Sequence, residues 1–323
     1  MPSMPSFNVD NVREVLNEGR NVQRQRNEEV RVAFFVDPTA SPAQIATVRD
    51  AFVPDLPGGL IHVERLSESG LVNVVPSTDL AVLICGDNSR ALATCARKII
   101  NEDVLCVAVC ESALDAPSVG ASLSARGRYG VIAALHPKSL LTRLAQWIVE
   151  HSDKSVAFAA NFSFVRDAMA KKMVDDVSFT NAALGALKVI PGGDFAAMVI
   201  NESKLALDVS ALYGKPLSPA RAAELVWVVG AGLCVRGLMR QISGHVQVAE
   251  WLLRGAAAWA GTEVIGQAIV TRFRSDEEFA DMVARVLSRS LQAFANATGF
   301  TIPQTQAQGG GAVVPERKLL GEA

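Results

Sequence analysis

The chain has 323 residues, of which 50% are hydrophobic and 20% are charged. A chain of this size and composition can bury a large core and is long enough for two domains, which excludes a disordered protein. Lys and Arg total 31 against 33 Asp and Glu, so the formal net charge of -2 gives no global attraction to nucleic acid or anionic lipid. We therefore expect no nucleic-acid partner, and any contact with a charged surface would be local.

Residues 1–28 begin the chain with a polar segment rich in Asn, Arg, Glu and Gln. Its few apolar residues fall at roughly helical spacing, which predicts a leader helix or an oligomerisation arm. No basic region followed by an apolar core is present, so no secretory signal is expected. The five cysteines are Cys85, Cys95, Cys106, Cys110 and Cys234. The first four lie in or beside apolar segments, a pattern that favours reduced core thiols in a cytoplasmic protein over a zinc site.

Residues 29–151 alternate short apolar runs with segments of helical period. Strands that are apolar on both faces and alternate with helices are typical of a mostly parallel sheet between two helical layers. The sequence therefore predicts a three-layer α/β domain. The expected strands span 31–37, 59–66, 79–86, 104–112 and 129–136, and the expected helices span 41–52, 88–100 and 138–151.

Residues 152–300 become Ala-rich, with helical period and little β-branched alternation, which predicts an all-α domain followed by a flexible tail at 301–323. The predicted helices are 154–173, 176–188, 194–213, 219–241, 247–271 and 276–297. No apolar run reaches the roughly 18 uncharged residues of a membrane span. For the most apolar runs, 225–235 and 255–270, docking on a membrane surface or a buried helix pair is therefore favoured over the remaining alternative, a true membrane span.

Motifs for common chemistries are missing from the places where they would act. The loop after the first strand, DPTASPAQ at 37–44, has neither the glycines nor the lysine of a phosphate-binding loop. The four histidines fall at unrelated positions, and no G-x-S-x-G or paired metal-ligand motif occurs. We therefore expect no catalytic residue, no cofactor and no metal. PGGD at 191–194 is interpreted as a corner between helices, with Asp194 as an N-cap.

Two groups of polar residues remain as candidates. Parallel sheets bind ligands beyond the carboxyl ends of their strands, and Asp37, Thr39, Gly86 and Asp87 are predicted to lie there. In the helical domain, Glu202 and Arg236 each fall within an otherwise apolar helical stripe.

Two opposite charges on apolar faces of neighbouring helices suggest a buried ion pair. This pair would either fix the helix register or serve as a switch or ligand contact. The basic segment 166–172 is either a solvated helix face or a contact for an anionic lipid or a partner.

The segment from 191 to 269 resembles the YcjF-like family, a bacterial domain of unknown function. The residues that carry this resemblance are Pro191, Gly192, Asp194, Tyr213, Gly214, Arg236, Arg240, Gly261, Thr262 and Gly266. In that family the domain often follows an Era-like or dynamin-like GTPase domain or occurs in inner-membrane proteins, and no reaction is assigned to it. The resemblance thus implies association with GTPases or membranes.

The preceding domain resembles a small GTPase in outline. TDLAVLICGDNSRAL looks like a strand ending near the DxxG region, VLCVAVCESALD stands where the base-reading strand would be, and GVIAALHPKSLLTRLAQWI looks like the final strand and helix. The phosphate loop is replaced by DPTASPAQ, and Asn-Lys-x-Asp by ESALD at 111–115. This pattern suggests a degenerate GTPase-like domain that keeps its sheet and has lost its nucleotide.

Two functions follow as expectations. The first is a non-catalytic adaptor or scaffold in the cytoplasm or at the inner face of the cytoplasmic membrane, with a protein, a GTPase or the membrane surface as partner. The second is an enzyme or a small-molecule or nucleotide sensor with its ligand near Asp37, Thr39, Gly86 and Asp87.

Overall fold

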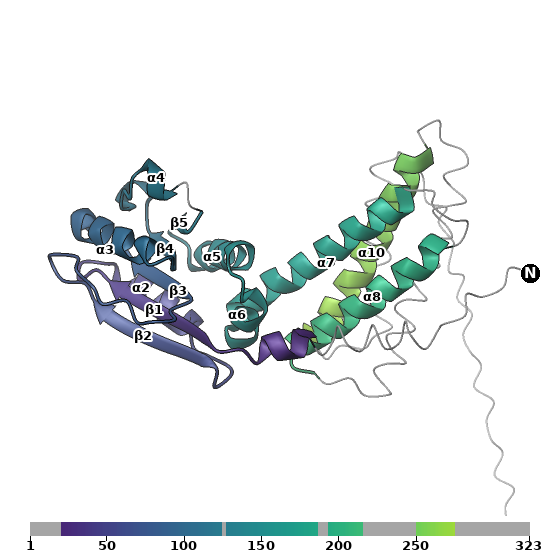
Figure 1. Ribbon diagram of the computed structural model, residues 1–323, viewed down its shortest axis with the longest axis horizontal. Helices are drawn as coiled ribbons and strands as arrows, with labels where there is room; N and C mark the ends of the chain where they lie inside the picture. Colours follow the sequence, from purple (N-terminus) through teal and green to yellow (C-terminus); the bar gives the residue numbers. More distant parts are fainter. Residues whose placement is uncertain (1–20, 125–126, 187–192, 216–249, 275–323) are drawn as a thin grey trace, which may run out of the picture.

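The computed structural model of the chain describes residues 21–124, 127–186, 193–215 and 250–274. Within these ranges a five-stranded parallel sheet with helices on both faces precedes a helical part (Figure 1). The expected combination of an α/β and an all-α part is thus confirmed. The strands are β1 (Val30–Val36), β2 (Gly59–Arg65), β3 (Leu80–Ile84), β4 (Leu105–Cys110) and β5 (Tyr129–Ala133).

The strands are ordered β2-β1-β3-β4-β5, and every neighbouring pair is parallel. This is one of the common orders of doubly wound sheets, in which the direction of winding reverses between β1 and β3. The two strands end in register, with Val36 opposite Ile84. Their carboxyl ends therefore form the crevice where sheets of this type bind ligands.

The two faces of the sheet differ in the size of their side chains. One face carries Val, Leu, Ile and Phe and packs against α2 (Pro42–Ala51) and α5 (Pro137–His151). The other face carries many Ala and Cys residues and packs against α3 (Ser89–Asn101). Short helices η1 (Ala113–Asp115) and α4 (Ala121–Ser124) lie between β4 and β5, whereas residues 66–79 cross from β2 to β3 without any helix. The edge at β2 is therefore the least covered part of the sheet.

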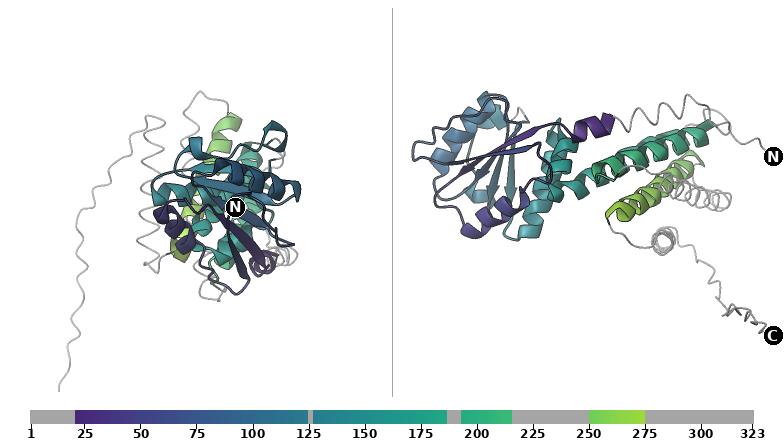
Figure 2. Two further views of the ribbon diagram at one scale, coloured as in Figure 1. Left: turned by 90° about the vertical axis from the view of Figure 1, so that its left-hand side faces the viewer. Right: turned by 90° about the horizontal axis from the view of Figure 1, so that it is seen from below.

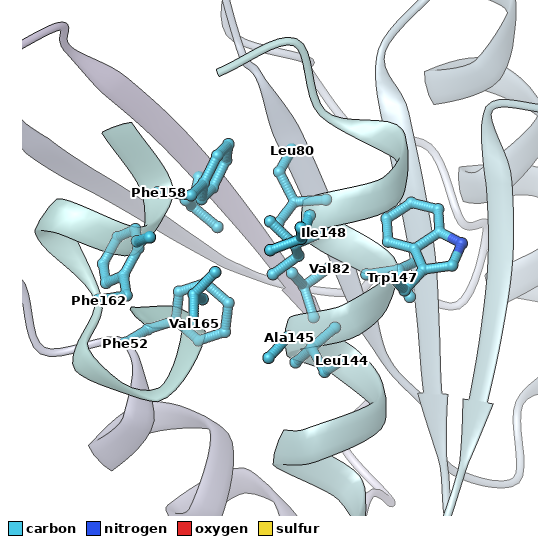
Figure 3. Packing of buried hydrophobic residues seen from close by; sticks show 14 of the residues in the cluster. Phe52, Leu80, Val82, Leu144, Ala145, Trp147, Ile148, Phe158, Phe162 and Val165 are labelled. Atoms are coloured by element: carbon cyan, nitrogen blue, oxygen red, sulfur yellow. The ribbon is translucent and has the colours of Figure 1, made fainter. Parts of the chain in front are cut away.

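The apolar core of the sheet continues into the helical part. Helices α6 (Ser155–Asn161) and α7 (Ser163–Ala186) follow α5, and Phe158, Phe162 and Val165 join the cluster formed with α5 (Figure 3). Helix α7 has 24 residues, about 36 Å at the usual rise. Its second half packs against α8 (Gly193–Leu212) and α10 (Glu250–Arg274) around a separate cluster (Figures 1 and 2). One continuous helix thus belongs to both cores.

The first helical boundary differs from the prediction. We expected a break at residues 174–175, but α7 runs through them, and the break lies at Phe162, which is extended at φ -123° and ψ 109°. The ion pairs Lys171–Asp175 and Lys172–Asp176 span the expected break and support the helix there. The break at Phe162 has a tertiary cause, because the backbone N–H of Asp55 donates to the carbonyl of Asn161 at 2.7 Å.

The remaining boundaries agree within a few residues where the structure describes them. Residues 21–26 of the leader segment are helical. Helix α8 begins at Gly193, so Asp194 lies in its first turn rather than at the predicted N-cap. The predicted helices 219–241 and 276–297, the tail 301–323 and residues 1–20 lie outside the described residues.

Candidate functional site

The structure brings the four predicted ligand candidates together at the carboxyl ends of β1 and β3. Asp37 directly follows β1, and Gly86 and Asp87 lie just beyond β3. The Thr39 hydroxyl joins the two loops, since its Oγ1 donates to Asp37 Oδ1 at 2.9 Å and accepts the backbone N–H of Asp87 at 2.8 Å. The four residues therefore lie at the point where the winding of the sheet reverses.

The Asp37 carboxylate is the centre of this cluster and is fully buried. Its Oδ1 also accepts the backbone N–H of Thr39 at 3.0 Å, and its Oδ2 accepts the backbone N–H of Asn88 at 3.0 Å. Backbone N–H groups at this edge are the donors that bind phosphate groups in nucleotide-binding sheets. Here two of them already bind a carboxylate that belongs to the chain, so Asp37 acts as an internal anion.

Gly86 lets the two loops approach this closely. A Cβ atom at Gly86 would lie 2.3 Å from Thr39 Oγ1 and 2.6 Å from the Ala40 nitrogen, so any larger residue would push the β1 loop away. Asn88 then caps α3, and its side chain accepts the N–H of Ala91 at 3.1 Å. The side chain of Asp87 is exposed, which leaves one carboxylate of the cluster open to solvent.

Buried thiols lie beneath the Gly86 turn. The thiols of Cys85 and of Cys110, at the end of β4, share a hydrogen bond, with their Sγ atoms 2.9 Å apart. This hydrogen bond, together with burial, raises the pKa of Cys85, and burial raises the pKa of Cys95 to about 12 and that of Cys106 well above its ordinary value. These three groups are therefore held as thiols at neutral pH, which is the less reactive form. Cys234 lies outside the described residues.

A second polar cluster lies in the core of the helical part. Glu202 on α8, Thr262 on α10 and Asn181 on α7 are all fully buried. The Thr262 hydroxyl donates to Glu202 Oε1 at 3.1 Å, and Asn181 Nδ2 donates to Thr262 Oγ1 at 2.9 Å. Asn201 Nδ2 in turn donates to Asn181 Oδ1 at 2.8 Å. Side-chain hydrogen bonds of this cluster therefore connect three helices.

Sequence reasoning singled out only part of this second cluster. The position of Glu202 within an apolar stripe indicated a buried carboxylate, whereas Asn181 and Thr262 were not recognised as its neighbours. The Gly261-Thr262 pair among the residues of the family resemblance was the one signal for Thr262. Arg236 lies outside the described residues, so its pairing with Glu202 stays a prediction.

The cations of the basic segment 166–172 have carboxylate partners in the structure. Arg166 pairs with Asp55 at 2.7 Å and so links α7 to the loop that precedes β2. Lys171 and Lys172 pair with acidic residues one turn further along α7. Upstream, Phe158 and Phe162 are buried in the core. Lys171 and Lys172 remain substantially exposed despite these ion pairs, and both alternatives for this segment, a solvated helix face and a contact for an anionic lipid or a partner, stay predictions.

The other predicted groups lie apart from these two clusters. His62 lies on β2, with its Nε2 atom 3.8 Å from Glu64 Oε2. His151 stacks on Trp147, with the ring centroids 4.7 Å apart. His136 precedes α5, and His245 lies outside the described residues. Within the described ranges, three or more His, Cys, Asp or Glu side chains do not gather in a way that could hold a metal ion. Among the same residues, no helix is long and apolar enough to cross a membrane.

Comparison with known proteins gives one result, for the helical part. Residues 149–298 match the family model described as Domain of unknown function (DUF697). The match begins in the last turn of α5 and includes α6, α7, α8 and α10. Both members of the predicted Glu202–Arg236 pair fall within it. No curated protein and no solved structure matches the chain.

Proposed function

We propose that the protein is a non-catalytic adaptor or scaffold. In this proposal the α/β part is a GTPase-type sheet that no longer binds a nucleotide. The helical part, a domain of the YcjF-like kind, contacts a membrane surface or a partner protein such as a GTPase. The observation that carries the proposal is the internal anion at the edge of the sheet, formed by the buried Asp37 carboxylate.

The chemistry of this edge opposes the binding of a phosphate. A phosphate group placed there would have to displace Asp37 from the N–H groups of Thr39 and Asn88. It would also leave a buried carboxylate without its hydrogen bonds next to a second negative charge, and both effects cost several kcal/mol. The exposed Asp87 carboxylate adds further repulsion at the mouth of the site.

Equilibrium binding of GTP and ATP to the full chain, measured by calorimetry with Mg²⁺, tests this proposal. We expect no saturable binding up to about 1 mM nucleotide, which corresponds to a binding free energy weaker than about -4 kcal/mol. A saturable isotherm with a micromolar dissociation constant would overturn the assignment of a nucleotide-free sheet.

Two exposed aromatic side chains support a contact surface on the helical part. Phe179 on α7 and Trp259 on α10 are 75% and 47% exposed, and aromatic side chains of this kind are enriched at interfaces with proteins and membranes. Flotation with anionic vesicles distinguishes the two kinds of partner. Flotation of the full chain would identify the membrane surface, whereas full recovery in the soluble fraction would leave a protein partner.

A sensor of small molecules is the second candidate, favoured by the position of Asp87. Its backbone N–H donates to Thr39 Oγ1 and its side chain is exposed at the reversal point of the sheet, where ligands of doubly wound sheets bind. A cationic or hydroxyl-rich ligand would suit this carboxylate better than a phosphate. A thermal-shift screen of metabolites tests this function, and a stabilisation that is lost in Asp87→Ala would support it over the scaffold.

A further inference from the structure

Strand β2 forms one edge of the sheet and is the least covered of the five strands. It pairs with β1 on one side and with no strand of the described residues on the other (Figure 1). Five of its seven residues are exposed, namely the four from Leu60 to Val63 and Arg65, whereas all residues of β3 and β4 are buried. The exposed edge therefore differs sharply from the centre of the sheet.

The exposed side chains of β2 are apolar on both faces of the sheet. Register with β1 places Ile61 and Val63 on the same face as Val32 and Phe34, and Leu60 on the opposite face. Leu60, Ile61 and Val63 are 42%, 41% and 64% exposed. The helix-free connection at 66–79 explains the exposure of Leu60, because in most doubly wound sheets a helix covers this position. The strand thus presents apolar surface above and below its edge.

The backbone of β2 also offers hydrogen-bonding groups along this edge. Val30 N–H donates to the Gly58 carbonyl and Leu66 N–H donates to the Val36 carbonyl, both at 2.9 Å. A parallel ladder uses alternate residues of each strand, so the even-numbered residues of β2 point their N–H and C=O groups toward β1. The odd-numbered residues, Gly59, Ile61, Val63 and Arg65, point theirs outward.

Two of the devices that protect edge strands from pairing, a proline or lysine in the strand and a β-bulge, are missing from this segment. The sequence GLIHVER at 59–65 contains no proline and no lysine. Its register with β1 is continuous over all seven residues, so no bulge turns the edge away. Long, regular, apolar edges of this type are those that add a further strand.

We propose that the β2 edge pairs with the β2 edge of a second copy of the chain, antiparallel about a two-fold axis at His62. This register pairs all seven residues and places Ile61 opposite Val63 of the second copy, so that the outward N–H and C=O groups of both bond across the axis. The same apolar pair forms twice by symmetry, which makes the strand complementary to itself.

The polar side chains of β2 fit the same register. His62 lies 3.8 Å from Glu64 within one chain, and in the pairing its side chain faces His62 of the second copy. Glu64 of the second copy then lies diagonally next to it, within reach of a long side chain. Each imidazole therefore has two carboxylates as hydrogen-bond acceptors for its ring N–H, which favours this pair of identical strands over an apolar strand of another protein.

Disulfide trapping tests the register directly. His62 residues would face each other in a non-hydrogen-bonded pair, with Cα atoms about 4.5 Å apart, which is within the range that a disulfide bridges. In a Cys234→Ser background, His62→Cys should give a covalent dimer under mild oxidation. Arg65→Cys is the matched control, because its copies would lie about 20 Å apart at the usual rise of six residues, and it should stay monomeric.

Sedimentation of the full chain provides the second readout. We expect a dimer whose dissociation constant rises at least about tenfold in Val63→Lys, because the charge would oppose an apolar side chain across the axis. Leu135→Lys, at a site 77% exposed beyond β5, should leave the dimer unchanged. A wild-type chain that stays monomeric, or a dimer that Val63→Lys leaves intact and His62→Cys fails to trap, would overturn the proposal.

Discussion

The sheet and the helical part satisfy their buried polar groups in opposite ways. In the sheet, the buried Asp37 carboxylate is bound by backbone N–H groups and a hydroxyl from two adjacent loops. In the helical part, buried Glu202 is bound through side chains that come from two other helices. The first arrangement forms as soon as β1 and β3 are paired, whereas the second requires three helices in the correct register.

This difference indicates which contacts make each part adopt one arrangement of its strands or helices. The sheet is specified mainly by apolar side chains on both faces, and its polar cluster closes one edge. The helices pack so closely at Gly266 that a Cβ atom added there would lie 2.4 Å from the Val174 side chain. Because many alignments of the helices could bury apolar side chains, the polar cluster is what selects one of them. A polar contact inside an apolar interface commonly has this role in helical assemblies.

Removing the predicted partner of Glu202 should have the largest effect on stability. If Arg236 pairs with it, Arg236→Ala leaves a buried carboxylate without its counter-charge, and the free energy of unfolding should fall by about 3–5 kcal/mol. Urea denaturation followed by tryptophan fluorescence measures this change. Arg274→Ala is the control, because its ion pair with Asp167 is exposed and should contribute at most about 1 kcal/mol. A loss below that value in Arg236→Ala would mean that the buried pair does not form.

Substitution of Asp37 tests whether its buried carboxylate stabilises the sheet. Asp37→Asn keeps the size of the side chain but replaces one accepting oxygen with an N–H donor, which faces a backbone N–H of the cluster. We expect a loss of about 1–3 kcal/mol in the free energy of unfolding. Asp87→Asn, at the exposed carboxylate of the same cluster, should change it by less than about 0.5 kcal/mol. Equal effects of the two substitutions would contradict the central role of Asp37.

The buried thiols predict a dependence of stability on alkaline pH. The pKa values of Cys85, Cys95 and Cys106 are raised in the folded chain, so these groups stay protonated while the unfolded chain ionises above its ordinary value near 8.5. Their stabilisation is complete below that pH and is lost as pH rises toward the folded pKa. Each thiol should contribute a slope of about -1.4 kcal/mol per pH unit between about pH 9 and 10.5.

Cys95→Ala separates this effect from general alkaline unfolding. In the presence of a reductant, the free energy of unfolding of the variant should fall less steeply between about pH 9 and 10.5 than that of the wild-type chain. The two slopes should differ by about 1.4 kcal/mol per pH unit, the contribution of one thiol. The comparison uses the slope with pH, because the absolute stability also changes when a buried side chain is shortened. Identical slopes would show that the Cys95 thiol ionises as readily in the folded chain as in the unfolded one.

Much of the sheet could be predicted because its strands are short and apolar, and helical segments follow β1, β3 and β5. The break at Phe162 could not, because no Gly or Pro marks it and its cause is the contact between Asp55 and the Asn161 carbonyl. The exposure of β2 could not be predicted either, since the sequence GLIHVER is apolar enough for a buried strand. Only the strand order shows that it lies at the edge.

The candidate site shows the same division between local and long-range signals. Asp37, Thr39, Gly86 and Asp87 were predictable from their positions after two apolar strands. That Asp37 itself occupies the anion position was not, because this depends on the register of β1 with β3 and on the distance between two loops. In the helical part, a helical stripe located Glu202, but only the packing of three helices identifies Asn181 and Thr262 as its neighbours.

The most direct test of the internal anion is an NMR titration of the full chain with GTP and Mg²⁺. The backbone amides of Thr39 and Asn88 report on the site, because both donate to Asp37. We predict that their chemical shifts stay unchanged up to about 1 mM nucleotide. Saturable shifts of these two amides would show that a phosphate displaces Asp37, and would contradict the account of a sheet that has lost its nucleotide.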